Sequence, residues 1–154
     1  MSLPELYVDS DSSTPAYLKP YRKLERKIAQ EQRKLSRMEK DSRNYTKQLG
    51  KIAKLHAKAK HQRADFLHKL SYRLVTHYDI ICIEDLDMSA IKKALSFGKS
   101  ASDNGWGMFV RMLSYKAEWY GSIVIKVGKF FPSSKTCCAC GHVHKELKLS
   151  DRVY

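Results

Sequence analysis

Long apolar runs are absent from this 154-residue sequence. No stretch approaches the roughly 18 consecutive apolar residues that a membrane-spanning helix requires. Residues 1–13 lack both the basic start and the apolar middle of a secretion signal. The sequence also has no Gly-rich phosphate loop and no Ser/His/Asp or Cys/His triad signature. These absences predict a soluble, cytoplasmic protein and give no support to a triad hydrolase.

Cysteine is scarce as well, and its placement matters more than its number. Three of the four cysteines crowd together at Cys137, Cys138 and Cys140, and the fourth is Cys82. Crowded cysteines in a chain without a secretion signal suit metal binding in a reducing cytoplasm better than a disulfide framework. Cys138 stands between the two expected ligands and Cys82 lies in a predicted strand, so we interpret both as bystanders.

The segment Cys137-x-x-Cys140-Gly141 has the spacing of a zinc knuckle. In such a knuckle, two thiolates from one tight turn occupy two of the four tetrahedral positions around Zn²⁺. A closed site needs two further ligands, and His142 and His144 stand closer together than a ligating histidine pair usually does. The sequence therefore predicts Cys137 and Cys140 as half of a structural zinc site and leaves the other ligands open.

The positive charge is concentrated in one segment. The chain has a formal net charge of +13, and the segment from Lys19 to Arg73, with 18 basic and five acidic residues, carries all of it. Such a concentration in a long helical stretch predicts a polyanionic partner, DNA or RNA. A merely soluble charged surface stays open as an alternative, whereas the scarcity of large apolar residues on the other face disfavours a membrane surface. The residues expected to contact nucleic acid are Arg22, Lys23, Arg26, Lys27, Arg33, Lys34, Arg37, Lys47, Lys51, Lys54, Lys58 and Arg63.

Helical periodicity covers the same segment. Apolar residues recur at helical spacing from residue 17 to about residue 40, and Pro20 suits a first-turn position. The pair Asp41-Ser42 interrupts the pattern and can cap a second helix over about 43–77. Two long helices joined by a short polar turn predict an antiparallel hairpin. A parallel coiled-coil dimer is the open alternative.

The sequence predicts three shorter elements outside the hairpin: a strand before it, and a helix and a strand after it. The range Leu3–Val8 is consistent with a short strand, which a polar, turn-rich segment ends. Further along, Ser102 or Asp103 can cap a helix with an apolar face that includes Tyr120, and Gly121 stops that helix. Residues 123–127 then begin another strand.

Glu84 is the most informative single residue. It follows the β-branched run Ile80-Ile-Cys-Ile83 and opens the acidic string Glu84-Asp85-Leu86-Asp87. We expect a buried central strand that ends in carboxylates. A carboxylate at the end of a sheet requires a compensating cation or hydrogen bonds, and a divalent metal is one such cation. The alternative is a solvated turn after the strand.

Several strings together resemble the TnpB/OrfB family of insertion-sequence proteins, which are relatives of type V CRISPR effector nucleases. They follow the family order across nearly the whole chain. The strings are Tyr21-Arg-Lys-Leu-Glu25, Gln32-Arg-Lys-Leu-Ser36, Lys54-Leu-His56, Gln62-Arg-Ala-Asp-Phe-Leu-His-Lys-Leu-Ser71, Ile83-Glu-Asp-Leu86, Asp103-Asn-Gly-Trp-Gly107, Tyr115-Lys116 and Phe131-Pro-Ser-Ser-Lys-Thr-Cys137 with Cys140-Gly141.

The resemblance implies an α/β fold: a partial RNase H-like (RuvC-like) domain with a long inserted basic helical hairpin and half of a zinc ribbon. The implied divisions are a strand and turn at 1–16, the hairpin at 17–77, a core strand, helix and strand at 78–131, and the half ribbon at 132–154. Family members are RNA-guided DNA endonucleases that use three acidic residues and Mg²⁺. Glu84 matches the second acidic position, a magnesium ligand, and Cys137 and Cys140 match the first zinc pair.

The sequence also departs from the family pattern. The family's first catalytic Asp belongs to a strand that would precede Met1, and its second Cys-x-x-Cys and third catalytic Asp would follow Tyr154. The resemblance therefore implies a truncated member associated with transposition, which binds DNA and guide RNA without cleaving. A non-catalytic nucleic-acid-binding remnant and a helical interaction module are the alternatives.

Overall fold

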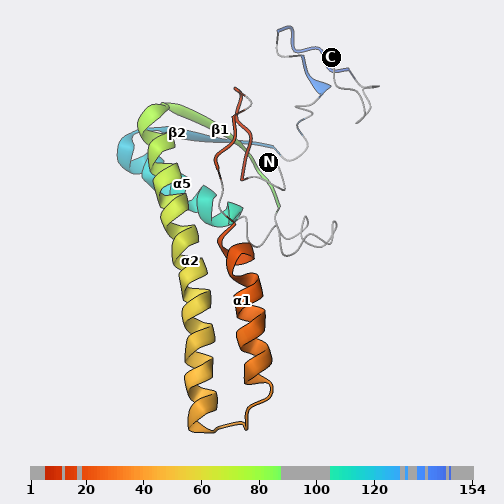
Figure 1. Ribbon diagram of the computed structural model, residues 1–154. Coiled ribbons are helices and arrows are strands. Elements are labelled where there is room, and N and C mark those ends of the chain that lie inside the picture. Colours follow the sequence, from red (N-terminus) through yellow and green to blue (C-terminus); the bar gives the residue numbers. More distant parts are fainter. Residues whose placement is uncertain are drawn as a thin grey trace.

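The computed structural model describes residues 6–11, 13–16, 19–87, 105–128, 131, 135–137, 139–144 and 146. Along the chain, the elements in this part are α1, α2, β1, α5 and β2. Figure 1 shows α1 and α2 as a long hairpin that projects from a small region of helix and sheet. The expected caps Ser102 and Asp103 and the bystander Cys138 lie outside the described residues, as does the first half of the expected strand at 3–8. Residues 6–8, its second half, are not a strand.

Helix α1 spans Pro20–Leu35. Pro20 is its first residue, where the missing N–H of proline costs no helical hydrogen bond and the fixed φ suits the first turn. Lys19 before it adopts a left-handed backbone with φ 42°. Ile28 is fully buried against α2, and the basic side chains occupy the other sides of the helix. The predicted helix is therefore confirmed, though it ends earlier than expected.

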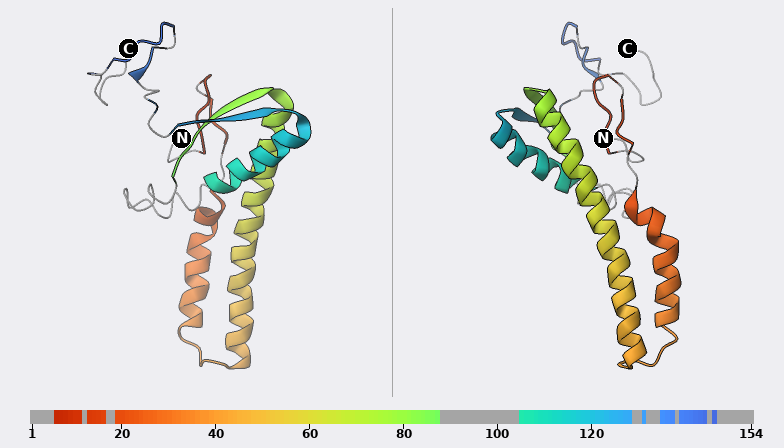
Figure 2. Two further views of the ribbon diagram at one scale, coloured as in Figure 1. Left: turned by 180° about the vertical axis from the view of Figure 1, so that it is seen from behind. Right: turned by 60° about the vertical axis from the view of Figure 1, so that its left-hand side comes forward.

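Helix α2 spans Arg43–His77 and runs back along α1, as all three views in Figures 1 and 2 show. Ser42 is its N-cap, and the Ser42 hydroxyl oxygen accepts a hydrogen bond from the Tyr45 N–H at 3.1 Å. The hairpin prediction is confirmed within one chain. Despite its 35 residues, α2 is too polar to cross a membrane, and no other described helix is both long and apolar enough to do so.

A buried polar contact ties the two arms of the hairpin together. Gln48 of α2 is buried, and its Nε2 donates to the backbone oxygen of Glu31 at 3.0 Å and to Glu31 Oε2 at 2.7 Å. Hydrogen bonds from Lys34 and from Gln48 hold the pKa of Glu31 below its usual value. Since a buried amide needs partners, this contact fixes the register of α1 on α2.

The core lies where the upper half of α2 packs against α5 and the sheet. Helix α5 spans Trp106–Tyr120, and strands β1 (Ile80–Glu84) and β2 (Ile123–Val127) pair in parallel with Ile80 opposite Ile123. Each strand follows its helix through a short turn, so α2–β1 and α5–β2 are two similar units side by side. The core side chains come from both units and from the N-terminal segment: Leu6, Leu67, Leu70, Val75, Ile83, Trp106, Phe109, Met112, Leu113 and Ala117.

The prediction that β1 is a buried central strand was wrong for the described part of the chain. The two-stranded sheet is covered on one face, where Ile83 is buried and Ile81 is half-buried. On the other face Ile80, Cys82 and Ile125 are exposed. A run of apolar residues cannot distinguish a strand covered on both faces from one covered on a single face, because the run contains no period-2 alternation.

Glycines set both ends of α5. Gly105 is the N-cap, with φ 70°, so neither expected cap residue begins this helix. A Cβ at Gly105 would lie 3.0 Å from Arg63 Cδ and 3.1 Å from Leu67 Cδ1, so the close approach of α5 to α2 requires glycine here. Gly121 ends the helix with φ 78°, as predicted. Tyr120, expected on the apolar face, is instead exposed.

Candidate nucleic-acid interface

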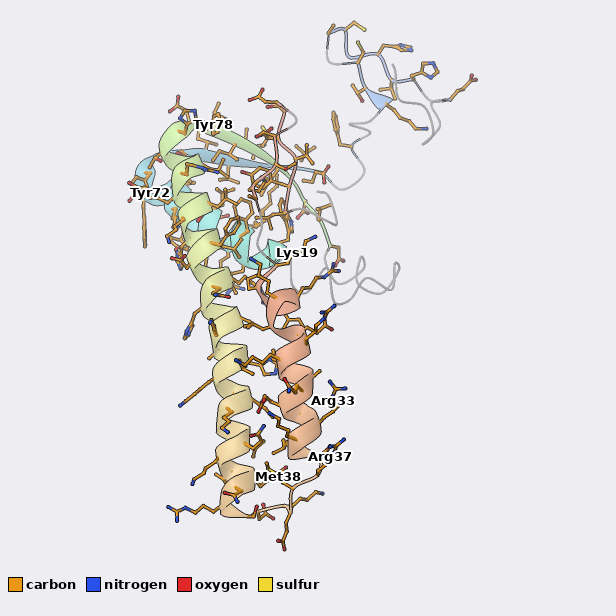
Figure 3. All side chains as sticks on the ribbon, in the orientation of Figure 1. Lys19, Arg33, Arg37, Met38, Tyr72 and Tyr78 are labelled. Atoms are coloured by element: carbon orange, nitrogen blue, oxygen red, sulfur yellow. The ribbon has the colours of Figure 1, made fainter. Side chains whose placement is uncertain are left out.

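Basic side chains cover the hairpin on its outer sides. Of the twelve residues that the sequence predicts to contact nucleic acid, eleven are exposed, seven of them on α1 or the turn after it and four on α2. Arg33 and Arg37, labelled in Figure 3, project away from α2 at the far end of the hairpin. The apolar side chains of both helices face each other, so the charges are left on the surface in contact with solvent.

Arg63 differs from the other eleven. It is half-buried, and its side-chain stem packs beside Gly105 at the beginning of α5. Arginine stems often cover apolar surface in this way while the guanidinium group reaches a polar neighbour. The structure therefore places Arg63 in the junction between hairpin and core. Its packing beside Gly105 explains its position without any contact with nucleic acid.

Glu84 lies at the end of β1, exposed, beside the point where β1 and β2 stop. The register pairs Glu84 with Val127, and the N–H of Asp85 donates to the Val127 oxygen at 3.1 Å. The hydrogen-bond pattern of the sheet therefore extends one residue past the end of β1. This hydrogen bond holds the backbone on the C-terminal side of Glu84 in place. Glu84 is therefore an exposed carboxylate on a backbone that the sheet holds in place.

A cavity of about 480 Å³ borders the edge of β1 away from β2. Residues 7–10 form its other wall, and Glu84, Tyr78 and Trp106 are among the residues that line it. Tyr7 stacks on Phe109 with 5.8 Å between ring centroids, and burial raises the pKa of Tyr7. Within the described residues, β1 has a strand neighbour on one edge only. Space beside Glu84 is therefore available on the unpaired edge.

The two predicted zinc ligands lie in one tight turn. Cys137 and Gly141 close it, with the Gly141 N–H donating to the Cys137 oxygen at 2.9 Å and the Cys137 N–H donating to the His142 oxygen at 2.8 Å. Gly141 has φ 73°, a conformation that glycine adopts without strain. Hydrogen bonds from the backbone of Cys140 and Ala139 lower the pKa of the Cys137 thiol. The turn therefore favours a thiolate, the form that binds Zn²⁺.

The structure does not bring these predicted groups into one centre. Figures 1 and 2 show the cysteine turn apart from the sheet that carries Glu84. Within the described ranges, no group of three or more His, Cys, Asp or Glu side chains could hold a metal ion. The residues fit a metal in part: Cys137 and Cys140 offer two sulfur ligands for Zn²⁺, and Glu84 offers one carboxylate for Mg²⁺.

Lys116 is a structural residue that the sequence pattern missed. It lies on the buried face of α5, and its Nζ donates to the backbone oxygen of His68 at 2.6 Å and to Ser71 Oγ at 2.8 Å. Ser71 Oγ in turn donates to the Leu67 oxygen at 2.7 Å. Burial lowers the pKa of Lys116. The sequence contained one indication that Lys116 is buried: it lies one helical turn after Met112 and so shares the apolar face of α5.

Comparison with known proteins gives matches over nearly the whole chain. The family OrfB_IS605, described as "Probable transposase", matches residues 1–95, and the Cas12f1-like TNB domain matches residues 106–154. A "Putative RNA-guided DNA endonuclease" of Streptomyces pristinaespiralis is 40% identical over 128 residues, which are 83% of this chain and 32% of that protein. "Putative RNA-guided DNA endonuclease InsQ" of Escherichia coli (strain K12) is 33% identical over 160 residues, covering 94% of this chain and 40% of that protein.

More distant similarity extends to a "TnpB-like protein" of Acanthamoeba polyphaga mimivirus, 30% identical over 109 residues that make up 67% of this chain and 20% of that protein. The chain spans about a third of the length of the first relative and two fifths of the second. The transposase family matches more than half of the chain, and the strings of the basic hairpin and of Glu84 fall inside that match. The chain therefore belongs to the TnpB/OrfB family of transposon proteins.

Proposed function

We propose that this chain is the nucleic-acid-binding part of a transposon-encoded, RNA-guided DNA endonuclease, and that it binds DNA and guide RNA without cleaving them by itself. The observation that carries the proposal is the hairpin of α1 and α2, with eleven predicted contact residues exposed on it. The names of the relatives support the endonuclease assignment, and the family supports the link to transposition.

Binding by the hairpin follows from counterion release. Each lysine or arginine that neutralises a phosphate releases condensed cations from the nucleic acid, which favours association at low salt. Two long helices hold the backbone of these residues in place, so little backbone order has to be created on binding. The remainder of the chain has as many acidic as basic residues and adds no comparable attraction.

Glu84 is proposed as a magnesium ligand of the longer protein, with an RNase H-like (RuvC-like) arrangement of the sheet. Mg²⁺ bound there would activate water and stabilise the leaving oxygen of a phosphodiester. Two features support a role at this position: Glu84 is exposed at the end of a parallel strand, and a cavity borders the unpaired edge of that strand. Because one carboxylate does not complete a two-metal site, the remaining carboxylates would come from other segments of the longer protein.

Cys137 and Cys140 are proposed as half of a structural zinc ribbon. The tight turn and the lowered pKa of Cys137 support this proposal. Zn²⁺ in such a site would fix the turn and stabilise the ribbon. With two thiolates from this chain, the coordination shell needs two further ligands, so we expect zinc to be bound weakly or shared between two chains.

The test is the salt dependence of affinity, measured by fluorescence anisotropy with a labelled oligonucleotide. We expect the logarithm of the association constant to fall linearly with the logarithm of salt concentration, with a slope of several units. Lys54→Gln on α2 should reduce that slope by about one. Lys126→Gln is the matched control, because Lys126 is exposed on β2, outside the hairpin. An affinity that does not change with salt, or no binding at low salt, would favour a helical interaction module instead.

A further inference from the structure

One side of α2 has an unbroken row of exposed polar and aromatic residues. Their spacing alternates between four and three residues, so on an ideal helix they share one face about 100° wide. The lower half of this face, Lys47, Lys51, Lys54 and Lys58, is here called the basic row. The complete face, every member of which is exposed, comprises Lys47, Lys51, Lys54, Lys58, His61, Asp65, His68 and Tyr72. Tyr72 lies on the side of α2 away from α1, as Figure 3 shows.

Helix α5 adds aromatic rings to the upper end of this face. Tyr72 meets Tyr120 edge to face, with 5.4 Å between ring centroids, and Tyr115 meets Trp119 in the same way at 4.7 Å. The Tyr115 hydroxyl lies 3.4 Å from His68 Nδ1. These five residues, from two helices that pack side by side, are here called the aromatic patch.

The aromatic patch is far more exposed than core aromatics are. Trp119 has 74% of its surface exposed, Tyr120 has 53% and Tyr72 has 49%. Large rings that are exposed to water would be stabilised by burial or by stacking against a partner. A cluster of such rings on a protein surface therefore indicates an interaction surface. The contacts among the rings hold them in place without covering them.

The charge around the patch indicates what covers it. The four lysines of the basic row lead to it along one helix face. Asp65, the acidic residue in this face, is paired with Lys69 at 2.8 Å, which offsets its charge. A basic track that leads to exposed rings is the combination by which proteins bind single strands: cations contact the phosphates and rings stack on the bases.

We propose that a single strand of nucleic acid runs along this face, with its phosphates on the basic row and one or more unpaired bases stacked on the aromatic patch at Trp119. This inference rests on the proposed function, which supplies the polyanion, and it adds the requirement for unpaired bases. A duplex offers phosphates to the lysines but keeps the faces of its bases stacked within the helix. RNA and DNA strands share the chemistry, so both belong in the test.

Trp119 provides a direct optical probe of stacking. The chain has two tryptophans, and the other, Trp106, is buried, with 6% of its surface exposed. The emission of the complete chain is measured while oligothymidylate, oligouridylate, a duplex of the same length, or heparin is added. We expect both single strands to quench the exposed tryptophan. Heparin, a polyanion without bases, and the duplex should bind with little quenching.

Three variants separate stacking from charge. Trp119→Ala should weaken single-strand binding about fivefold to a hundredfold, the range expected for the loss of one base–aromatic stack, and leave heparin binding unchanged. Trp119→Phe keeps a ring, so it should retain most of the affinity while losing the quenching. Phe131→Ala is the matched control, because Phe131 is an aromatic residue with 55% of its surface exposed that lies after β2, outside α2 and α5. It should change neither quantity.

The outcomes distinguish this inference from the proposed function. If the unaltered chain binds none of the ligands (heparin, duplex or single strands), both the proposed function and this inference are wrong. Binding of all ligands without quenching at Trp119, or equal losses from Trp119→Ala and Phe131→Ala, would overturn the inference and leave the hairpin's role intact. Self-association that Trp119→Ala abolishes, without any effect on single-strand binding, would also overturn it and would assign the patch to a protein partner.

Discussion

The Cys137 sulfur shows how backbone geometry sets the chemistry of one residue. The turn after Cys137 folds back so that N–H groups of Cys140 and Ala139 donate to the sulfur. These donors stabilise the negative thiolate more than the neutral thiol, and the pKa of Cys137 is lowered as a result. No cation is required for this shift, so it should be present before any metal binds.

The first prediction at this scale concerns thiol reactivity. Because the thiolate is the nucleophile, the alkylation rate of Cys137 should reach half its maximum at a pH below the value of about 8.5 for an ordinary thiol. Mass spectrometry of the metal-free chain after timed iodoacetamide pulses gives the rate at each pH. Cys140→Ser keeps both backbone donors, so most of the shift should remain. A midpoint at the ordinary value in the unaltered chain would contradict the hydrogen-bonded turn.

Single residues differ in how readily the sequence predicts them. Cys137 and Cys140 are predicted as zinc ligands from their spacing, and Glu84 is predicted as a magnesium ligand from its place after an apolar run and from the family resemblance; these roles stay predictions. Lys116 was not singled out, since a lysine on a helix is normally solvated and nothing in the sequence shows that α2 will cover it. Trp119 was not singled out either, because the sequence does not show that its ring will lie against Tyr115 beside the exposed face of α2.

At the scale of elements, Lys116 joins α5 to α2. Its amine lies between the helices and donates to the His68 oxygen and to Ser71 Oγ, and the whole residue is buried. A buried cation carries a desolvation cost that hydrogen bonds only partly offset. The contact therefore adds little to the free energy of unfolding. Its main effect is to fix the position of α5 relative to α2.

The prediction for this contact uses two substitutions. Lys116→Ala removes stem and amine, so it should lower the free energy of unfolding by about 1–3 kcal/mol. Lys116→Met keeps the stem and removes the desolvated amine, so it should stay within about 1 kcal/mol of the unaltered chain. Urea unfolding followed by circular dichroism measures both. Equal losses from the two substitutions would mean that the amine, not the packing, stabilises the interface.

The same contact has a pH signature. The folded pKa of Lys116 is lowered from the usual 10.5, so between the two values the unfolded chain binds more protons than the folded chain. In that window the free energy of unfolding should rise with pH, and Lys116→Met should lose this rise relative to the unaltered chain.

Element boundaries were predictable where a residue has a strong local preference. Pro20, Ser42 and Gly121 mark helix ends in the sequence and in the structure. Gly105 was not recognised as the start of α5, because its role comes from the close approach of Arg63 and Leu67 on another helix. Burial of β1 on one face was equally unpredictable, since coverage of a sheet depends on elements distant in sequence.

In the whole molecule, the net positive charge and the candidate catalytic residue lie in different regions. All of the net charge lies in the segment that forms the hairpin, while Glu84 lies at the end of the sheet in the core. Counting charges along the sequence predicted the first of these. It could not show that four lysines align on one face of α2 toward exposed rings, because Tyr115, Trp119 and Tyr120 reach that face only when α5 packs on α2.

The central claim is that the hairpin binds nucleic acid independently of Glu84. The most direct measurement compares the affinities of three proteins for one labelled single strand at low salt, together with cleavage in the presence of Mg²⁺. The proteins are the unaltered chain, a variant with Gln at Lys47, Lys51, Lys54 and Lys58, and Glu84→Gln. We predict that the quadruple variant loses at least about tenfold in affinity, that Glu84→Gln binds like the unaltered chain, and that none of the three cleaves. Equal binding by the quadruple variant and the unaltered chain, or cleavage by the unaltered chain above background, would contradict the account.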